Sequence, residues 1–180
     1  MKRCRDDEES DDEENESVCA VDNNIYFYTE VTRESVLRLC KLLGEQSKKH
    51  EALTLHVHSE GGCAFSGLAA MDMISTLNVT TIAEGLCASA ATFMLLAGKR
   101  RLMTRHSVLL IHEIASIVGW SKYTELKAEL QNNELLMDMI ISIYKSKSSL
   151  KKKAICKMLK DDKYIDSTTA LQYGLIDCIA

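Results

Sequence analysis

Short β-forming runs alternate with longer helical patterns along most of this 180-residue chain. The runs at residues 24–30, 53–58, 79–83 and 108–111 are rich in apolar or β-branched residues and predict strands. Apolar periodicity predicts helices at residues 32–48, 64–77, 89–98, 121–144, 149–159 and 168–173. Thr32 is a suitable N-cap for the first helix. Strands that alternate with helices indicate a single α/β layered domain with a largely parallel sheet.

The acidic residues are concentrated at the beginning of the chain. The first 17 residues contain nine Asp or Glu and three Lys or Arg, with no apolar periodicity. We therefore expect an acidic, disordered tail over residues 1–20 and a folded domain over residues 21–180. The other 163 residues contain 17 acidic and 19 basic side chains, which form no extended basic patch. This balance argues against nucleic-acid binding, and no apolar run reaches the roughly 18 residues that span a membrane.

The seven cysteines show no metal-binding or disulfide spacing. Their number is odd, no Cys-x-x-Cys occurs, and no secretion signal precedes them. We therefore expect reduced thiols and a cytoplasmic location. His56, His58 and Cys63 could contribute to a metal site, but a fourth ligand is missing, so no metal is expected.

Three features with chemical potential lie just beyond predicted strands. They are Gly61-Gly62, Ser89 and His112, and the carboxyl ends of parallel strands gather at one edge of a sheet. Ser89 also lies near a helix start, where backbone N–H groups can stabilise an oxyanion. Serine catalysis further needs a base and a carboxylate that orients it, for which His112 and either Asp161 or Asp162 are candidates.

Each of these residues has a plainer structural interpretation as well. Ser89 could be a helix cap or a small packing residue, and His112 could simply end a strand. The paired glycines could form only a tight turn, and residues 160–164 could be a charged loop. The ordered combination of the features, rather than any one alone, favours a catalytic site.

The same features resemble the ClpP family, the proteolytic subunits of Clp proteases, from about residue 25 to the C-terminus. Ser59-Glu60-Gly61-Gly62 is similar to the family's Ser-Pro-Gly-Gly, and residues 85–91 are similar to its Gly-Gln-Ala-Ala-Ser-Met-Gly. Ile111-His112-Glu113 resembles Ile-His-Gln, and residues 162–177 resemble the closing stretch with the catalytic aspartate. The resemblance selects Asp162 rather than Asp161.

The resemblance implies a role for each of these residues. Ser89 would be the nucleophile, His112 the general base and Asp162 the residue that orients it. The backbone N–H groups of Gly62 and Ala90 would form the oxyanion hole. An extended segment containing Gly61, Gly62 and Cys63 would pair with a substrate strand.

The resemblance also implies a fold and an assembly. The fold would be the ClpP/crotonase-like layered arrangement, and the helix at residues 121–144 would be the handle through which two rings stack. The chain would act as a homo-oligomeric serine endopeptidase on peptides or unfolded proteins. It would need no cofactor of its own, and ATP would enter only through a possible AAA+ unfoldase partner.

Several positions depart from the family pattern. Glu60, Ile114 and Thr168 replace prolines, and Thr54 and His56 replace tyrosines of the pocket that receives the ATPase. A catalytically degenerate paralogue that serves as a structural or regulatory ring subunit is therefore the alternative. A crotonase-type acyl-CoA enzyme would share the fold, but the chain has no basic cluster for nucleotide phosphates.

Overall fold

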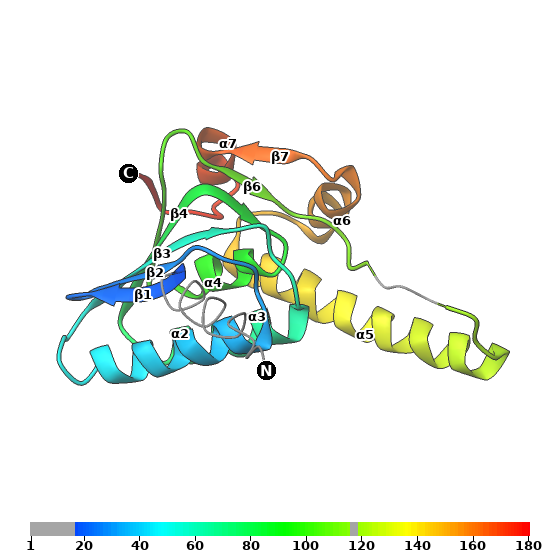
Figure 1. Cartoon of the computed structure of the whole chain (residues 1–180). Helices are drawn as coiled ribbons and strands as arrows, with labels where there is room; N and C mark the ends of the chain where they lie inside the picture. The colour runs from blue at the N-terminus through cyan, green and yellow to red at the C-terminus, as the bar shows by residue number, and fades with distance from the viewer. Residues whose placement is uncertain (1–16, 116–118) are drawn as a thin grey trace, which may run out of the picture.

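A computed structural model describes residues 17–115 and 119–180 of the chain. These residues form an α/β domain built on one mixed sheet (Figure 1). The sheet order is β1-β2-β3-β4-β5-β8, with β6 beside β4 and β7 beside β6. The strands are β1 Val18–Val21, β2 Asn24–Phe27, β3 Leu53–Ser59, β4 Val79–Ala88, β5 Arg100–Met103, β6 Val108–Leu110, β7 Tyr164–Asp166 and β8 Cys178–Ile179.

Most strand pairs are parallel, as the alternation of strands and helices predicts. Only the β1–β2 and β6–β7 pairs of the described sheet are antiparallel. The helices are α2 Arg33–Gln46, α3 Ala64–Ser75, α4 Ala91–Ala97, α5 Tyr123–Lys147, α6 Lys152–Asp161 and α7 Ser167–Gln172. The predicted α/β layered fold with flanking helices and one long helix is therefore confirmed.

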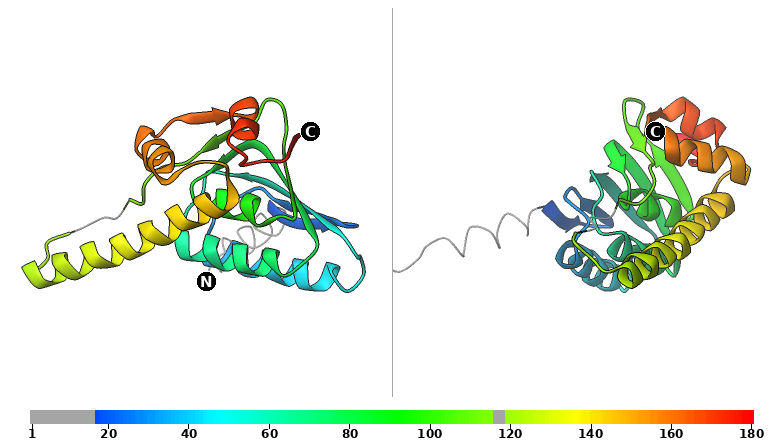
Figure 2. Two further views of the ribbon diagram at one scale, coloured as in Figure 1. Left: turned by 180° about the vertical axis from the view of Figure 1, so that it is seen from behind. Right: turned by 90° about the vertical axis from the view of Figure 1, so that its right-hand side faces the viewer.

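The helices are unevenly distributed around the sheet. Helices α2, α3 and α4 lie on one side of it, whereas α6 and α7 lie beside β6 and β7 (Figure 1). The long helix α5 runs from the middle of the domain outward and projects beyond the body, as the rear view in Figure 2 also shows. Within the described residues, no helix is long and apolar enough to cross a membrane.

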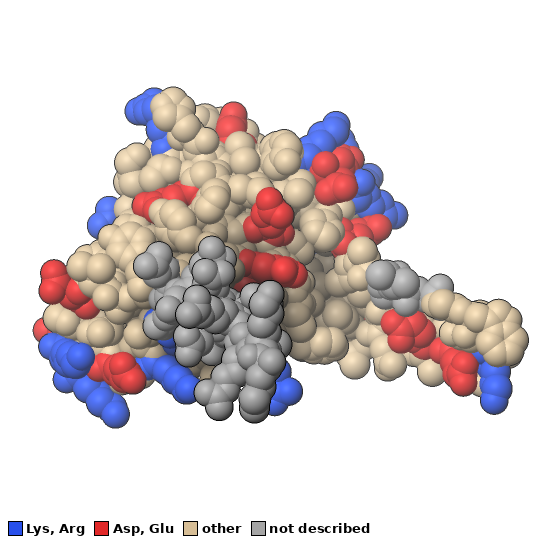
Figure 3. Space-filling view, viewed as in Figure 1, with Lys and Arg blue, Asp and Glu red and all other residues tan. Residues whose placement is uncertain are grey.

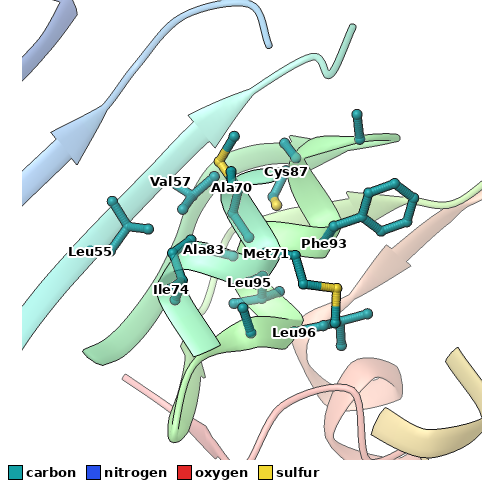
Figure 4. Close-up of a cluster of buried hydrophobic side chains, with 14 of the residues drawn as sticks. Leu55, Val57, Ala70, Met71, Ile74, Ala83, Cys87, Phe93, Leu95 and Leu96 are labelled. Atoms are coloured by element: carbon teal, nitrogen blue, oxygen red, sulfur yellow. The ribbon is translucent and has the colours of Figure 1, made fainter. Parts of the chain in front are cut away.

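The hydrophobic core fills the layer between the sheet and α3 and α4. Leu55 and Val57 of β3 point into this layer and are fully buried, while the intervening side chain of His56 points to the other face of the sheet. Figure 4 shows these strand residues packed against Ile74 of α3 and Leu95 of α4. Burial of such apolar side chains provides the main force that fixes the helices on the sheet.

The first helix begins where the sequence predicts. Thr32 caps α2, because its hydroxyl accepts a hydrogen bond from the Ser35 N–H at 3.1 Å. The Ser35 hydroxyl in turn accepts from the Thr32 N–H at 3.0 Å, which completes a capping box. This reciprocal pair satisfies two N–H groups at the helix start.

The predicted boundary of the acidic tail is wrong by three residues. Residues 18–20 belong to β1, which pairs with β2 in the register Val18↔Phe27 to Val21↔Asn24. Val18 is buried in the core, so this segment gains apolar contacts that tail residues lack. Residues 1–16 of the predicted tail lie outside the described residues.

Strand β4 is longer than the sequence predicts, and it changes neighbours midway. Its first half pairs with β5 from Thr80↔Arg100 to Ala83↔Met103. Its second half pairs with β6 from Leu86↔Val108 to Ala88↔Leu110. The predicted turn at Gly85 is therefore a bulge inside a continuous strand, and this strand delivers Ser89 to the edge of the sheet.

Candidate active site

Ser89 occupies a strained turn between β4 and α4. Its φ angle is 52°, in the left-handed region that non-glycine residues seldom adopt. The Ser89 N–H donates to the Leu110 carbonyl at 2.8 Å. Its carbonyl accepts from the N–H of Thr92 at 3.0 Å and from the Thr92 hydroxyl at 2.6 Å. A serine in a sharp strand-to-helix turn is the geometry of a nucleophile elbow.

A buried hydroxyl chain connects this turn to the long helix. The Thr92 hydroxyl uses its hydrogen for the Ser89 carbonyl, so it accepts from the hydroxyl of Tyr144 at 2.6 Å. Tyr144 lies on α5 and is almost completely buried. Burial raises the pKa of Tyr144, which keeps its hydroxyl protonated as a donor.

His112 follows β6 and lines the same cavity as Ser89. The cavity has a volume of about 880 Å³. The His112 ring is half-buried, and its Nδ1 lies 2.6 Å from the Glu113 carbonyl. In the neutral ring this carbonyl accepts a hydrogen bond from the Nδ1–H group, which leaves Nε2 as the basic nitrogen. That tautomer is the one a general base needs.

The fold brings the backbone of Asp162 toward His112. The register of β6 with β7 pairs Val108↔Asp166, Leu109↔Ile165 and Leu110↔Tyr164. The ladder ends there, two residues short of both His112 and Asp162. The N–H of Glu113 also donates to the Leu159 carbonyl at 3.1 Å, near the end of α6.

The side chain of Asp162 is not joined to the other two candidates. Asp162 is exposed, with φ 48° just after α6, and it does not line the cavity. Within the described residues, its carboxylate makes no hydrogen bond or ion pair. The structure therefore brings Ser89 and His112 to one cavity and leaves Asp162 out of its lining.

Two backbone N–H groups near Ser89 are free to bind an anion. Among the described residues, neither Gly62 nor Ala90 donates its N–H to an acceptor, although Gly61, Cys63 and Ser89 do. A Cβ on Gly61 would lie 2.6 Å from the Ser89 Cβ and 3.3 Å from the Ala90 nitrogen. The glycine loop therefore lies directly against Ser89, as an oxyanion hole requires.

The proposed substrate-binding segment ends at Cys63. Helix α3 begins at Ala64, as the sequence predicts, so only Cys63 separates Gly62 from the helix. The N–H of Cys63 is also engaged, because it donates to the Val31 carbonyl at 2.8 Å. The exposed Cys63 thiol still lines the cavity, and the Ser66 hydroxyl and N–H hold the pKa of this thiol below its usual range.

The cavity walls combine apolar and acidic side chains. The apolar part includes Phe65, Phe93, Ile114, Leu135, Leu136, Met139 and Ile140. The charged lining residues are Glu60, Glu113 and Glu129, and no Lys or Arg is present among the described lining residues. In the face shown in Figure 3, acidic side chains lie near the centre as well as toward the ends, whereas the basic ones lie toward the ends.

Sequence reasoning missed the residues that hold the site in place. Thr92 and Tyr144 were not identified, because their contact depends on how α5 packs against α4. Glu113 could have been noticed, since it directly follows His112. Among the described residues, no group of three or more His, Cys, Asp or Glu is placed to hold a metal ion.

Comparison with known proteins identifies the family. The family model for Clp protease matches residues 9–180. The chain belongs to the Clp protease family. This Clp protease family member is 25% identical over 172 residues to the "ATP-dependent Clp protease proteolytic subunit" of Chlorella vulgaris. The match covers 86% of this chain and 85% of the relative.

Two further proteins are similar to this Clp protease family member, one in sequence and one in structure. The Sorghum bicolor protein of the same name is 27% identical over 129 residues, which cover 69% of this chain and 60% of the relative. A ClpP1 point mutant from Listeria monocytogenes has a similar structure, with a TM-score of 0.80 and 21% identity. That match covers 88% of this chain and 91% of the bacterial one, and it shows the same fold.

Proposed function

We propose that this chain is a serine endopeptidase and the proteolytic subunit of a Clp-type oligomeric protease. The observation that carries the proposal is the position of Ser89. It lies in a strained turn on the same cavity as His112, beside the unpaired N–H groups of Gly62 and Ala90. The names of the relatives from Chlorella and Sorghum support the same activity.

In the proposed mechanism, His112 Nε2 takes the proton of the Ser89 hydroxyl as that oxygen attacks a peptide carbonyl. The tetrahedral oxyanion accepts hydrogen bonds from the N–H groups of Gly62 and Ala90. Asp162 turns toward Nδ1 and replaces the Glu113 carbonyl as its acceptor. Protonated His112 then gives its proton to the leaving amine, and water hydrolyses the acyl-enzyme by the same route.

The test is labelling by a fluorophosphonate, which reacts with an activated serine. We expect labelling at Ser89 in the assembled protein and none in Ser89→Ala, while Ser75→Ala serves as the matched control. His112→Ala should lower the labelling rate and peptide turnover on the order of 10³-fold, because nucleophile and base act as a unit. Wild-type protein that assembles but is not labelled would exclude the enzymatic role.

The proposal extends to assembly, partners and location. We propose a homo-oligomer of stacked rings that takes peptide or unfolded-protein substrates, with ATP used only by an AAA+ partner and no cofactor in this subunit. Exposed apolar side chains on the projecting helix α5 support contact with a second copy. The six described cysteines are free thiols, in agreement with the proposed cytoplasmic location.

One observation favours the alternative of a degenerate ring subunit. The Asp162 carboxylate has no partner among the described residues, and Nδ1 of His112 is already engaged by Glu113. A subunit of this kind would assemble without hydrolysing peptides. Native mass spectrometry together with a peptidase assay on the same sample distinguishes the two roles.

A further inference from the structure

The pairing of β3 with β4 is interrupted just before Ser89. Val57 pairs with Ala83, and the next pair is Ser59 with Cys87. A single residue of β3, His58, therefore faces three residues of β4. In a regular ladder the backbone of β3 would accept hydrogen bonds from this stretch of β4, whereas at this bulge the Leu86 N–H bonds to a side chain instead.

The side chain of His58 replaces the missing backbone partner. Its Nδ1 lies 3.1 Å from the Leu86 nitrogen and 3.0 Å from the Glu84 carbonyl oxygen. In the neutral ring with its lone pair on Nδ1, this atom accepts the Leu86 N–H. The imidazole thus supplies an acceptor for the Leu86 N–H where the ladder is interrupted.

Gly85 is shaped to admit this ring. Its φ angle is 58°, and a Cβ at this position would lie 2.5 Å from Nδ1 of His58. The ring of Tyr28 packs against the imidazole with a centroid distance of 5.3 Å. His58 is therefore fixed between a glycine backbone and an aromatic ring.

The bulge is also the point at which β4 leaves β5 and joins β6. Beyond it, Leu86 pairs with Val108, and Ser89 donates to the carbonyl of Leu110. His112 follows Leu110 by two residues. We call the place where β4 changes neighbours, between Ala83 and Leu86, the β4 junction. Its position determines the placement of both Ser89 and His112.

We propose that His58 is a positioning residue that fixes the β4 junction through the Leu86 N–H and thereby aligns Ser89 with His112. The catalytic part of this inference rests on the proposed function. His58 does not line the cavity that Ser89 and His112 share, so it acts through the backbone of β4.

The arrangement has a consequence for pH. A protonated His58 has no lone pair on Nδ1, so it releases the Leu86 N–H and donates to the Glu84 carbonyl instead. The charged and titratable groups around the ring are Glu84 on β4, Tyr28 next to β2, and Glu30 and Glu60, which line the same small cavity. Acid should therefore weaken the junction and slow the reaction of Ser89.

The experiment compares two substitutions of His58. Asn places an amide oxygen at the same distance along the side chain as Nδ1, and it accepts a hydrogen bond at any pH. Leu fills a similar volume and accepts none. We expect His58→Leu to lower the fluorophosphonate labelling rate and kcat about 10- to 100-fold with little change in KM, since small misplacements of reacting groups have effects of this size.

His58→Asn should be labelled at the wild-type rate at neutral pH. Its labelling rate should fall less than that of the wild type as the pH is lowered, because Asn keeps its acceptor in acid. His106→Leu, at an exposed histidine, is the matched control and should behave as wild type. Labelling of His58→Leu at the wild-type rate would overturn the inference. So would an acid-side profile of His58→Asn identical to that of the wild type.

A second measurement does not depend on catalysis. Hydrogen exchange at the Leu86 amide should be slow in wild type and in His58→Asn at neutral pH, and at least tenfold faster in His58→Leu. Equal exchange in all three proteins would overturn the proposed hydrogen bond. If wild type is never labelled while Leu86 exchange follows this pattern, the proposed function fails and the role of His58 at the junction stands.

Discussion

At the level of single residues, backbone strain coincides with the proposed chemistry. Three non-glycine residues of the described chain have positive φ angles, and two of them are Ser89 and Asp162. Such a conformation costs about 1–3 kcal/mol and persists only where surrounding contacts impose it. At Ser89 those contacts are the hydrogen bonds to Leu110 and Thr92. The strain therefore serves to present the hydroxyl to the cavity.

Gly61 lies directly against the nucleophile and leaves no room for a side chain. Its φ angle is 96°, and an added Cβ would lie 2.6 Å from the Cβ of Ser89. We expect Gly61→Ala to destabilise the fold by about 1–3 kcal/mol and to displace Ser89. Thermal unfolding and fluorophosphonate labelling measure the two effects.

Gly119→Ala is the matched control for this substitution. A Cβ at Gly119 would meet no heavy atom within 4 Å, so stability and labelling should stay at wild-type values. Full labelling of Gly61→Ala at wild-type stability would show that the loop is not packed against the nucleophile as described.

At the level of elements, the contact between α4 and α5 should support the reactive turn. Tyr144→Phe removes the hydroxyl that donates to Thr92 and leaves the ring in place. We expect a loss of about 0.5–1.5 kcal/mol in unfolding free energy, with slower labelling of Ser89. Tyr123→Phe, at the exposed start of α5, should change neither. Equal effects of the two substitutions would contradict the role of the buried hydroxyl chain.

A network on β2, β3 and β4 predicts a specific response to acid. Burial alone would raise the pKa of Glu84, but hydrogen bonds from Tyr28 and His56 outweigh it and lower that pKa. A lowered pKa in the folded state gives stability above the unfolded pKa of about 4.3. That stability is lost as pH falls through the folded value.

Glu84→Gln should therefore destabilise the protein at pH 7 more than at pH 3, as measured by urea unfolding. Tyr28 remains a donor across this range, because burial and the Glu84 carboxylate raise its pKa to about 12. Glu45→Gln, on the exposed side of α2, is the control and should show no such pH dependence. A constant difference between wild type and Glu84→Gln would contradict the lowered pKa.

The elements that sequence patterns predicted are those with a clear period or a long apolar face. Strand β3 alternates between buried positions and half-buried or exposed ones, and α2 begins at its expected cap. Strands β5 and β8 were missed because they are short, and β5 begins with two arginines. Such strands form because a neighbouring strand pairs with them, which local sequence does not reveal.

The same distinction applies to the candidate site: residues with a local sequence signal were predicted, and contacts that depend on packing were not. Ser89, His112 and the glycine pair were found because they lie beyond strands whose ends meet in a layered α/β fold. The supporting contacts of Thr92 with Tyr144 and of His58 with Leu86 were not found. They join residues 52 and 28 positions apart, so they depend on how the elements pack.

At the level of the whole molecule, α5 is the strongest candidate for an assembly surface. It projects from the body, and its outer half exposes Tyr123, Leu126 and Leu130 beside the fully exposed Trp120. Apolar groups gathered in this way mark contact surfaces. On the proposed assembly of stacked rings, we expect Leu130→Glu to reduce the particle mass in native mass spectrometry from that of the rings to that of smaller species. Loss of assembly in Leu37→Glu on α2 instead would assign the contact to another face.

The charged residues that line the two cavities predict a peptide preference under the proposed function. Glu60 and Glu113 line the large cavity, and Glu30 joins Glu60 in the smaller one on the other side of the glycine pair. No Lys or Arg lines either cavity within the described residues, although residues 18–180 contain 19 basic and 17 acidic side chains. The acidity is thus local to the cleft, where it attracts positive charge.

On the proposed function, peptides with Lys beside the scissile bond should have a higher kcat/KM than matched peptides with Glu. Partly exposed pairs contribute about 0.2–1 kcal/mol each, so the preference should be a few-fold and should decline with added salt. Glu60→Gln should reduce the preference without lowering the cleavage of a neutral norleucine peptide, and Glu45→Gln should leave it unchanged. If Glu60→Gln and salt leave the Lys-to-Glu ratio unaltered, the carboxylates around the glycine pair do not face the bound peptide.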